Sequence, residues 1–266
     1  MAQAAPRSVL GLLGFALRDV LGNLAGLARI AWPYYALAAV CAALGFAFAG
    51  AGTLGDLANL FGPGTASLVT GIAVVACTVS WQRHVILGEP LAGTAPLNGR
   101  VARYFLWSMV ISLICAVPIL AGFGAVFGLG LAYPDPAGEG TFSIQPVGIM
   151  LCVAAFLLGV LLILRLILVL PAISVDDRTM TFARSWQVTR GHGLRLAGAL
   201  LLLTAGLALL GALMALVVAA LEAAGEGSLV APVLALILQA VVNLIATIAA
   251  ASLIARAYAL LVPPAS

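Results

Sequence analysis

The chain contains no lysine and few charged residues of any kind. Charged side chains make up 8% of its 266 residues, whereas soluble globular domains carry about 25%. Hydrophobic residues make up 64%, and the mean hydropathy is +1.21. This composition excludes an ordinary soluble fold, and the apolar runs leave no room for a separate catalytic domain of roughly 100 residues. We therefore expect a single integral membrane domain over residues 1–266.

Residues that support metal or nucleophilic chemistry are also scarce. The only histidines, His84 and His192, lie outside any HExxH motif or cysteine cluster. Asp176 and Asp177 are adjacent, and neighbouring side chains on a helix point about 100° apart, so we interpret them as caps of a following helix. All four cysteines lie inside apolar runs, where a thiol packs as a small hydrophobe: Cys41, Cys77, Cys115 and Cys152. The sequence thus predicts no catalytic residue, no metal site, no cofactor and no enzymatic activity.

What the chain does have is twelve arginines, which gather at one set of ends of its apolar runs. The intervening loops carry only acidic residues: Asp56, Asp135, Glu139, Glu222 and Glu226. Because arginine in short loops stays on the cytoplasmic side of a membrane, this alternation predicts the orientation of the chain. We expect a multi-pass protein of a bacterial inner membrane with both termini in the cytoplasm.

The apolar runs predict about six crossings, since a bilayer requires about 20 residues of helix. We place them near residues 34–51, 65–81, 104–131, 147–170, 194–221 and 230–254. The Gly-rich stretch 52–64 is expected to be a loop, Pro118 to kink the third crossing, and Pro171 to end the fourth. Glycines in the fifth crossing are expected to let the last two helices approach closely: Gly198, Gly206 and Gly211.

Two further segments have the amphipathic pattern of helices that lie along a membrane surface. In residues 1–31 leucines fall on one side of a helical wheel, and Arg18, Asp19 and Arg29 fall on the other. In residues 176–192, Phe182 and Trp186 lie opposite Arg184 and Ser185. The predicted fold class is therefore all-α, a polytopic membrane helix bundle of about six transmembrane helices plus two cytoplasmic-side amphipathic interfacial helices.

Three polar residues of the sixth crossing are spaced by four and therefore share one helical face: Gln239, Asn243 and Thr247. We interpret them first as hydrogen-bonding groups between helices. The alternative is a polar lining for a lipid headgroup or a small solute.

Seven cytoplasmic arginines could hold anionic lipid headgroups, at about 1 kcal/mol each. They are Arg83, Arg100, Arg103, Arg178, Arg184, Arg190 and Arg195. The other interpretation is that they only determine topology. We expect membrane lipids as partners, including anionic phospholipid, and no nucleic acid.

The segment 165–198 carries a recognisable pattern: Arg165, Pro171, Ser185, Trp186, Thr189, Arg190 and Gly191. It resembles the membrane domain of glycerophosphodiester phosphodiesterases and of related uncharacterised bacterial inner-membrane proteins. The soluble phosphodiesterase domain, with its metal-binding His and Glu residues, has no counterpart here. The resemblance therefore implies a six-helix membrane module with cytoplasmic surface helices, and it does not imply the activity.

These observations lead to two functional hypotheses. The first is a non-enzymatic accessory or scaffold protein that packs against lipid and a partner membrane protein, or against itself, through Gly- and Ala-rich faces. The second is a carrier or channel for lipid or another amphipathic small solute, which would use the Asn243 face and the arginine patch.

Overall fold

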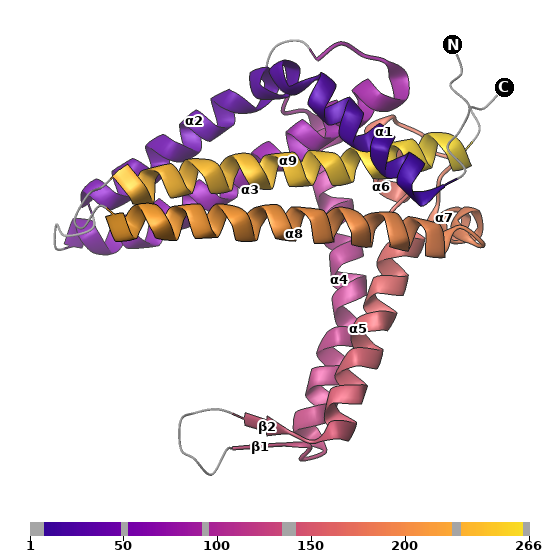
Figure 1. Cartoon of the computed structure of the whole chain (residues 1–266). Coiled ribbons are helices and arrows are strands. Elements are labelled where there is room, and N and C mark those ends of the chain that lie inside the picture. Colours follow the sequence, from indigo (N-terminus) through magenta and orange to yellow (C-terminus); the bar gives the residue numbers. More distant parts are fainter. Residues whose placement is uncertain (1–7, 49–52, 92–95, 135–141, 225–229, 263–266) are drawn as a thin grey trace.

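The computed structural model describes residues 8–48, 53–91, 96–134, 142–224 and 230–262. Within these ranges it contains nine helices and two short strands (Figure 1). The helices are α1 (Val9–Gly22), α2 (Leu24–Phe48), α3 (Thr53–Leu87), α4 (Gly99–Gly128), α5 (Pro146–Leu166), α6 (Val169–Ser174), α7 (Phe182–Thr189), α8 (Gly193–Ala224) and α9 (Val230–Leu261). The strands, β1 (Ala132–Pro134) and β2 (Phe142–Ile144), pair antiparallel between α4 and α5.

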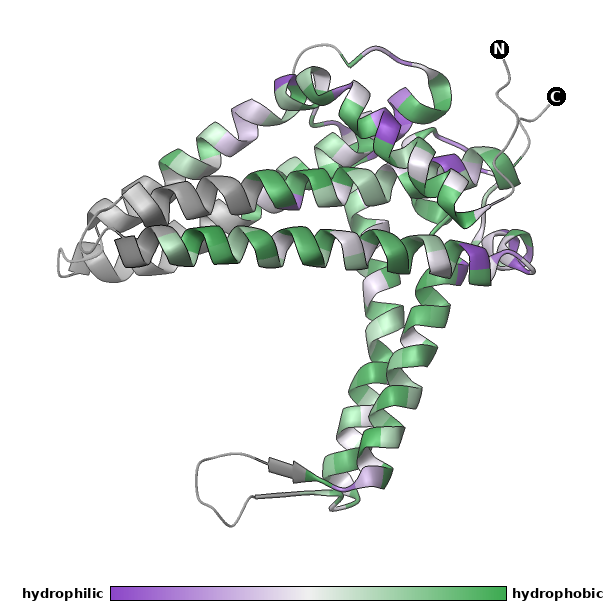
Figure 2. Ribbon diagram, in the orientation of Figure 1, coloured by the Kyte–Doolittle hydropathy of each residue, from purple (hydrophilic) through white to green (hydrophobic). Residues whose placement is uncertain are grey.

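The long helices form three hairpins, α2 with α3, α4 with α5, and α8 with α9. Figure 1 shows the α4–α5 hairpin leaving the molecule in one direction, while α3, α8 and α9 run together in another. Figure 2 shows hydrophilic residues gathered around α1, α6 and α7, where the two arms meet, and hydrophobic residues along the arms. We call this meeting point the polar junction.

Long apolar helices place the protein in the membrane class, as the composition predicts. Among the described residues, four segments are long and apolar enough to cross a bilayer, and α1 with the start of α2 would count as a fifth if this bent pair is one span. The four are Gly99–Gly128, Pro146–Ser174, Gly193–Ala220 and Val241–Leu261.

The first amphipathic segment is divided rather than continuous. Ser8 caps α1, whose Gly11 amide donates to the Ser8 hydroxyl oxygen at 3.1 Å. At Asn23 the chain bends by 67°, and α2 then continues through Pro33 into the apolar run. Residues 1–7 of the predicted interfacial helix lie outside the described residues. The wheel pattern correctly indicates a helix, but it misses the break and places the start of the next helix too late.

Proline and glycine mislead the sequence interpretation at two other places. Helix α3 begins at Thr53, so the backbone of the predicted loop 52–64 is helical from that residue on. Packed membrane helices tolerate such residues because neighbouring groups satisfy the backbone. Pro171 does not end a helix either, since α5 ends at Leu166 and Pro171 lies within α6. It occupies the first turn of α6, where a backbone N–H has no intrahelical partner to lose.

Among the described glycines, the tightest helix contact lies between α4 and α5. A Cβ atom built on Gly122 would come within 2.5 Å of the Ala155 Cβ, and one on Gly159 would come within 3.0 Å of the Cys115 carbonyl oxygen. Among the described residues, a Cβ on Gly206 or Gly211 would meet nothing within 4 Å. A Cβ on Gly198 would lie 3.8 Å from Val9 of α1. The α9 side chains before Val241 lie outside the described residues, so the close approach of α8 and α9 through these glycines stays a prediction. The small-residue seam that the structure shows lies between α4 and α5.

The buried core lies beside the polar junction, where α2, α3, α6 and α9 come together. Trp81, Ile30, Leu168 and Leu253 are among its largest fully buried side chains. The Trp81 indole N–H donates to the hydroxyl oxygen of Ser252, which joins α3 to α9. The core thus holds together the ends of the helices that carry the polar residues.

Candidate functional site

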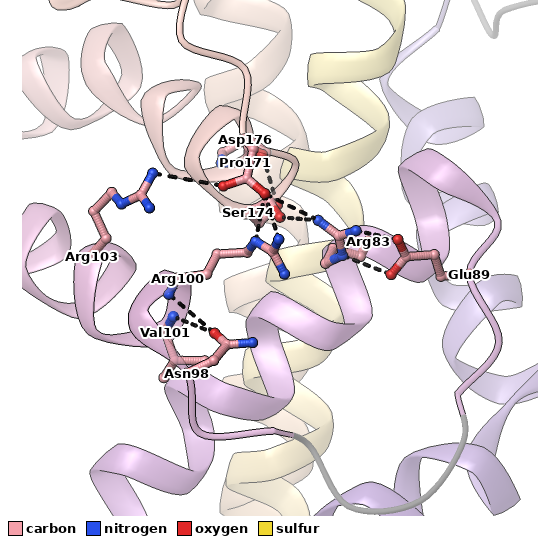
Figure 3. A network of polar contacts seen from close by, with 9 residues as sticks. All are labelled: Arg83, Glu89, Asn98, Arg100, Val101, Arg103, Pro171, Ser174 and Asp176. Atoms are coloured by element: carbon pink, nitrogen blue, oxygen red, sulfur yellow. Dashed lines mark hydrogen bonds and ion pairs between the residues drawn. The ribbon is translucent and has the colours of Figure 1, made fainter.

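The polar junction is organised around Asp176, which follows the short helix α6. Asp176 has a φ of 58°, in the left-handed region that Asp and Asn adopt more readily than other side chains. The amide of Asp177 donates to the Ala172 carbonyl at 2.8 Å, and that of Asp176 donates to the Ile173 carbonyl at 3.3 Å. This pair of bonds is a Schellman motif, which closes the end of α6. The turn directs the Asp176 carboxylate toward the ends of α3 and α4 (Figure 3).

Three arginines from α3 and α4 converge on this one carboxylate (Figure 3). Arg100 donates from Nε to Oδ2 at 2.7 Å, and Arg83 and Arg103 form ion pairs at 3.8 and 3.7 Å. The hydrogen bond from Arg100, with the nearby positive charges of Arg103 and Arg83, holds the pKa of Asp176 below its ordinary value. Asp176 therefore stays ionised and joins three helices.

Arg83 also forms hydrogen bonds with two groups other than Asp176. Its Nε donates to Glu89 Oε2 at 2.7 Å, and its Nη1 donates to the Ser174 carbonyl at 3.0 Å. The hydrogen bond from Arg83 lowers the pKa of Glu89 below its ordinary value. Arg83 thus links the loop after α3 to the end of α6.

Two more polar contacts attach α9 to the junction. Asp177 accepts from the Tyr258 hydroxyl at 2.5 Å and from the Thr179 amide at 2.9 Å. Arg256 forms a bidentate pair with Asp19 of α1, with both N···O distances 2.8 Å. Bidentate pairs of this kind are among the stronger polar contacts, because the planar guanidinium matches the carboxylate.

The predicted headgroup patch divides into two sets. Arg83, Arg100 and Arg103 are engaged with Asp176, and Arg184 donates to Thr179. The remaining three arginines are exposed, and no ion pair is seen for them within the described part of the chain: Arg178, Arg190 and Arg195. Headgroup binding by this patch stays a prediction.

The predicted capping role of Asp176 and Asp177 is wrong. Helix α7 is capped by Thr181, whose hydroxyl oxygen accepts from the Arg184 amide at 3.2 Å. The predicted second surface helix over 176–192 is also shorter than expected, since α7 covers Phe182–Thr189 only. The sequence did carry a signal for the true role, because Asp176 is an acidic residue placed among basic loops.

A cavity of about 230 Å³ lies beside the Asp176 network. Its polar lining comes from Ser80, Arg83, Glu89, Asn98 and Arg100. The two histidines and the Asp176–Asp177 pair are not part of this lining. The Nδ1 atom of His84 lies 2.7 Å from the Glu89 carbonyl oxygen, whereas His192 is exposed after α7.

The two described side chains of the predicted polar face of α9, Asn243 and Thr247, do not line this cavity. The Thr247 hydroxyl donates to the Asn243 carbonyl at 2.8 Å, within the same helix rather than across to another. The Asn243 side chain is exposed. The Gln239 side chain lies outside the described residues.

The motif residues of the 165–198 segment meet where α5 contacts α7. The Ser185 hydroxyl donates to the Arg165 carbonyl at 2.6 Å, and the Thr189 hydroxyl donates to the Ser185 carbonyl at 2.8 Å. Ser185 is fully buried, although the helical wheel placed it on the same side as Arg184, opposite Phe182 and Trp186. The Arg165 guanidinium lies over the Trp186 ring, 5.3 Å from Cζ to the ring centroid.

The end of α7 explains the last two motif residues. Arg190 is the C-cap, and Gly191 follows with a φ of 88°. Glycine adopts this left-handed conformation without the strain that a Cβ atom would introduce. The motif therefore encodes the connection from α5 through α7 to α8.

Comparison of the chain with protein-family models, with curated proteins and with solved structures finds no match.

Proposed function

We propose that the chain is a multi-pass bacterial inner-membrane module with six crossings and both termini in the cytoplasm. The contacts of α1 with α9 support this topology, because the Asp19–Arg256 pair holds the first and last helices at the same junction. The gathering of hydrophilic residues at that junction supports it as well (Figure 2). The resemblance to the membrane domain of glycerophosphodiester phosphodiesterases agrees with such a module.

Within this module we propose a non-enzymatic accessory or scaffold function. The observation that carries it is the α4–α5 hairpin, which contacts the rest of the described chain at the polar junction and leaves its length uncovered (Figure 1). Large apolar side chains are exposed along both helices, among them Met109, Leu113, Leu120, Met150, Val153 and Phe156. Lipid alone gives helices no hydrophobic reason to associate, so a partner would bind through shape and close packing.

The tightness of the hairpin supports this assignment. The seam at Gly122 and Gly159 brings α4 and α5 together and makes the pair one unit. A unit with fixed shape can present a constant surface to the helices of another membrane protein, or to a second copy of this chain. The ion pairs of Asp176 support the same function, because they hold the base of the hairpin to α3.

Site-specific photo-crosslinking in native membranes tests this function. A photoreactive amino acid at Met109 or Phe156, both exposed on the hairpin, should yield the same protein adduct. The same substitution at Leu10 on α1, also exposed, is the matched control and should not yield it. The adduct should weaken when Leu113 is shortened to alanine. Lipid adducts alone at all three positions would contradict the scaffold function.

Within the described residues, no observation favours the carrier or channel alternative. The cavity lining includes neither Asn243 nor Thr247.

A further inference from the structure

The Arg165 guanidinium differs from the other arginines at the junction. Its Nε and Nη1 atoms are fully buried and have no hydrogen-bond partner within the described residues. Arg83, Arg100, Arg103 and Arg256 each pair with a carboxylate. A guanidinium offers only donors, so these N–H groups can be satisfied only by an acceptor. A buried charge without a partner is costly, which makes this edge of the side chain a strong attractor for an anion.

The neighbours of Arg165 fix where this anion would lie. Its guanidinium stacks on Trp186, which is 41% exposed, and the Ser185 hydroxyl bond holds α7 against the end of α5. On the same helix as Trp186, the ring of Phe182 contacts that of Trp107 of α4 edge to face, with 5.2 Å between the ring centroids. Tryptophan rings prefer the headgroup level of a membrane. This preference would place the base of the hairpin, where α7 contacts α5, at the depth of lipid phosphates.

The charge of the surrounding segment has the matching sign. Residues 165–195 hold five arginines and two aspartates, so this segment alone accounts for a formal charge of +3, equal to that of the whole chain. Both aspartates are engaged elsewhere, Asp176 with the three arginines and Asp177 with Tyr258 and Thr179. No acidic group of the segment is left to satisfy Arg165.

We propose that Arg165 and Trp186 form a binding site for a phosphate group, supplied by a phospholipid of the cytoplasmic leaflet. The guanidinium lies over the indole, and its Nε and Nη1 atoms are fully buried there, so they can bind two phosphate oxygens only when this edge turns outward. The flexible stem of the arginine lets this edge turn toward the membrane surface. The site requires that the chain is embedded in a membrane, but it does not require the scaffold function.

Native mass spectrometry of the detergent-purified protein tests the site. The probes are phosphatidylglycerol and a diacylglycerol with the same acyl chains but no phosphate. The wild-type protein should retain one phosphatidylglycerol and release the diacylglycerol. Arg165→Gln should weaken phosphatidylglycerol binding by roughly tenfold or more, as expected for a charge-assisted bond. Arg178→Gln removes an exposed arginine of the same segment and should bind like wild type.

Inorganic phosphate in a thermal-unfolding assay distinguishes the two sources of phosphate. If phosphatidylglycerol raises the unfolding temperature and millimolar phosphate does not, the lipid is the source of the phosphate group. Protection of the wild type by phosphate, absent in Arg165→Gln, keeps the site but assigns it to a free anion. Equal retention of phosphatidylglycerol and diacylglycerol overturns the proposal even if Arg165→Gln does not fold. Equal weakening by Arg165→Gln and Arg178→Gln overturns it as well, since that is a general charge effect.

This experiment is independent of the crosslinking test. A hairpin that captures no protein would remove the scaffold function and leave phosphatidylglycerol binding unchanged. If phosphatidylglycerol binding fails these tests, the proposed partner surface of the hairpin is unaffected.

Discussion

Asp176 lies in a left-handed turn and faces arginines from two other helices. Asp176→Asn isolates the effect of its charge, because asparagine also tolerates this backbone conformation. The variant should lower the free energy of unfolding in detergent by about 1 kcal/mol, a small value because the side chain is partly exposed to solvent. Arg178→Gln is the control for loss of a surface charge. An Asp176→Asn protein as stable as this control would show that the network does not hold the junction.

The same carboxylates give the stability a defined pH dependence. Asp176 and Glu89 have pKa values below their ordinary values of 3.8 and 4.5, so the folded state binds protons less readily than the unfolded state. Their contribution is therefore complete above the ordinary values and is lost as the pH falls through them toward the lower folded values. Thermal unfolding between pH 7 and pH 3 should show that the stability of the wild type falls more steeply with acid than that of the Asp176→Asn, Glu89→Gln double variant. Parallel curves would contradict this assignment.

Single residues also show how far the sequence predicts the site. The spacing of the apolar runs predicted that the arginines gather at one set of helix ends, and the structure brings Arg83, Arg100 and Arg103 together there. The ion pair of Arg100 with Asp176 was not predicted, because it joins residues 76 positions apart and depends on how α4 packs against α6. Arg165 was recognised as a motif residue, but its stacking on Trp186 requires the turn after α6 that brings α7 back to α5.

Helices α4 and α5 depend on small residues along their seam. Gly122→Ala would place a Cβ within 2.5 Å of the Ala155 Cβ, which cannot rotate away, so the helices must separate. We expect a loss of about 1 to 3 kcal/mol, typical of overpacking. Gly124→Ala on the same helix is the matched control, since its Cβ would meet nothing within 4 Å among the described residues. Unfolding in a denaturing detergent measures the stability of both variants. Equal stability of the two would exclude a tight seam.

The elements themselves were predicted well where apolar runs are long, and poorly where the chain changes direction. Helices α4, α5, α8 and α9 fall on predicted crossings, because hydrophobicity over about 20 residues is a strong signal. The break at Asn23 and the position of Pro171 inside α6 were missed. At Asn23 the amide donates to the Val20 carbonyl and the side chain donates to the Asp19 carbonyl, and Pro171 lies in a first helical turn, where proline is tolerated. The pattern of apolar residues carries neither signal.

The whole molecule combines one polar junction with two apolar arms (Figure 2). Composition predicted the membrane class directly. The directions of the arms were beyond prediction, since they follow from contacts between distant residues such as the Asp19–Arg256 pair.

Cysteine accessibility tests most directly whether the junction lies on one membrane face. In a variant whose four native cysteines are replaced by alanine, single cysteines are introduced at Ser8, Gln145 and Gln187, all exposed. In right-side-out spheroplasts, a membrane-impermeant maleimide should label Gln145→Cys and leave Ser8→Cys and Gln187→Cys unlabelled. Inverted vesicles should give the reverse pattern. Labelling of Gln145→Cys and Gln187→Cys from the same side would contradict the account.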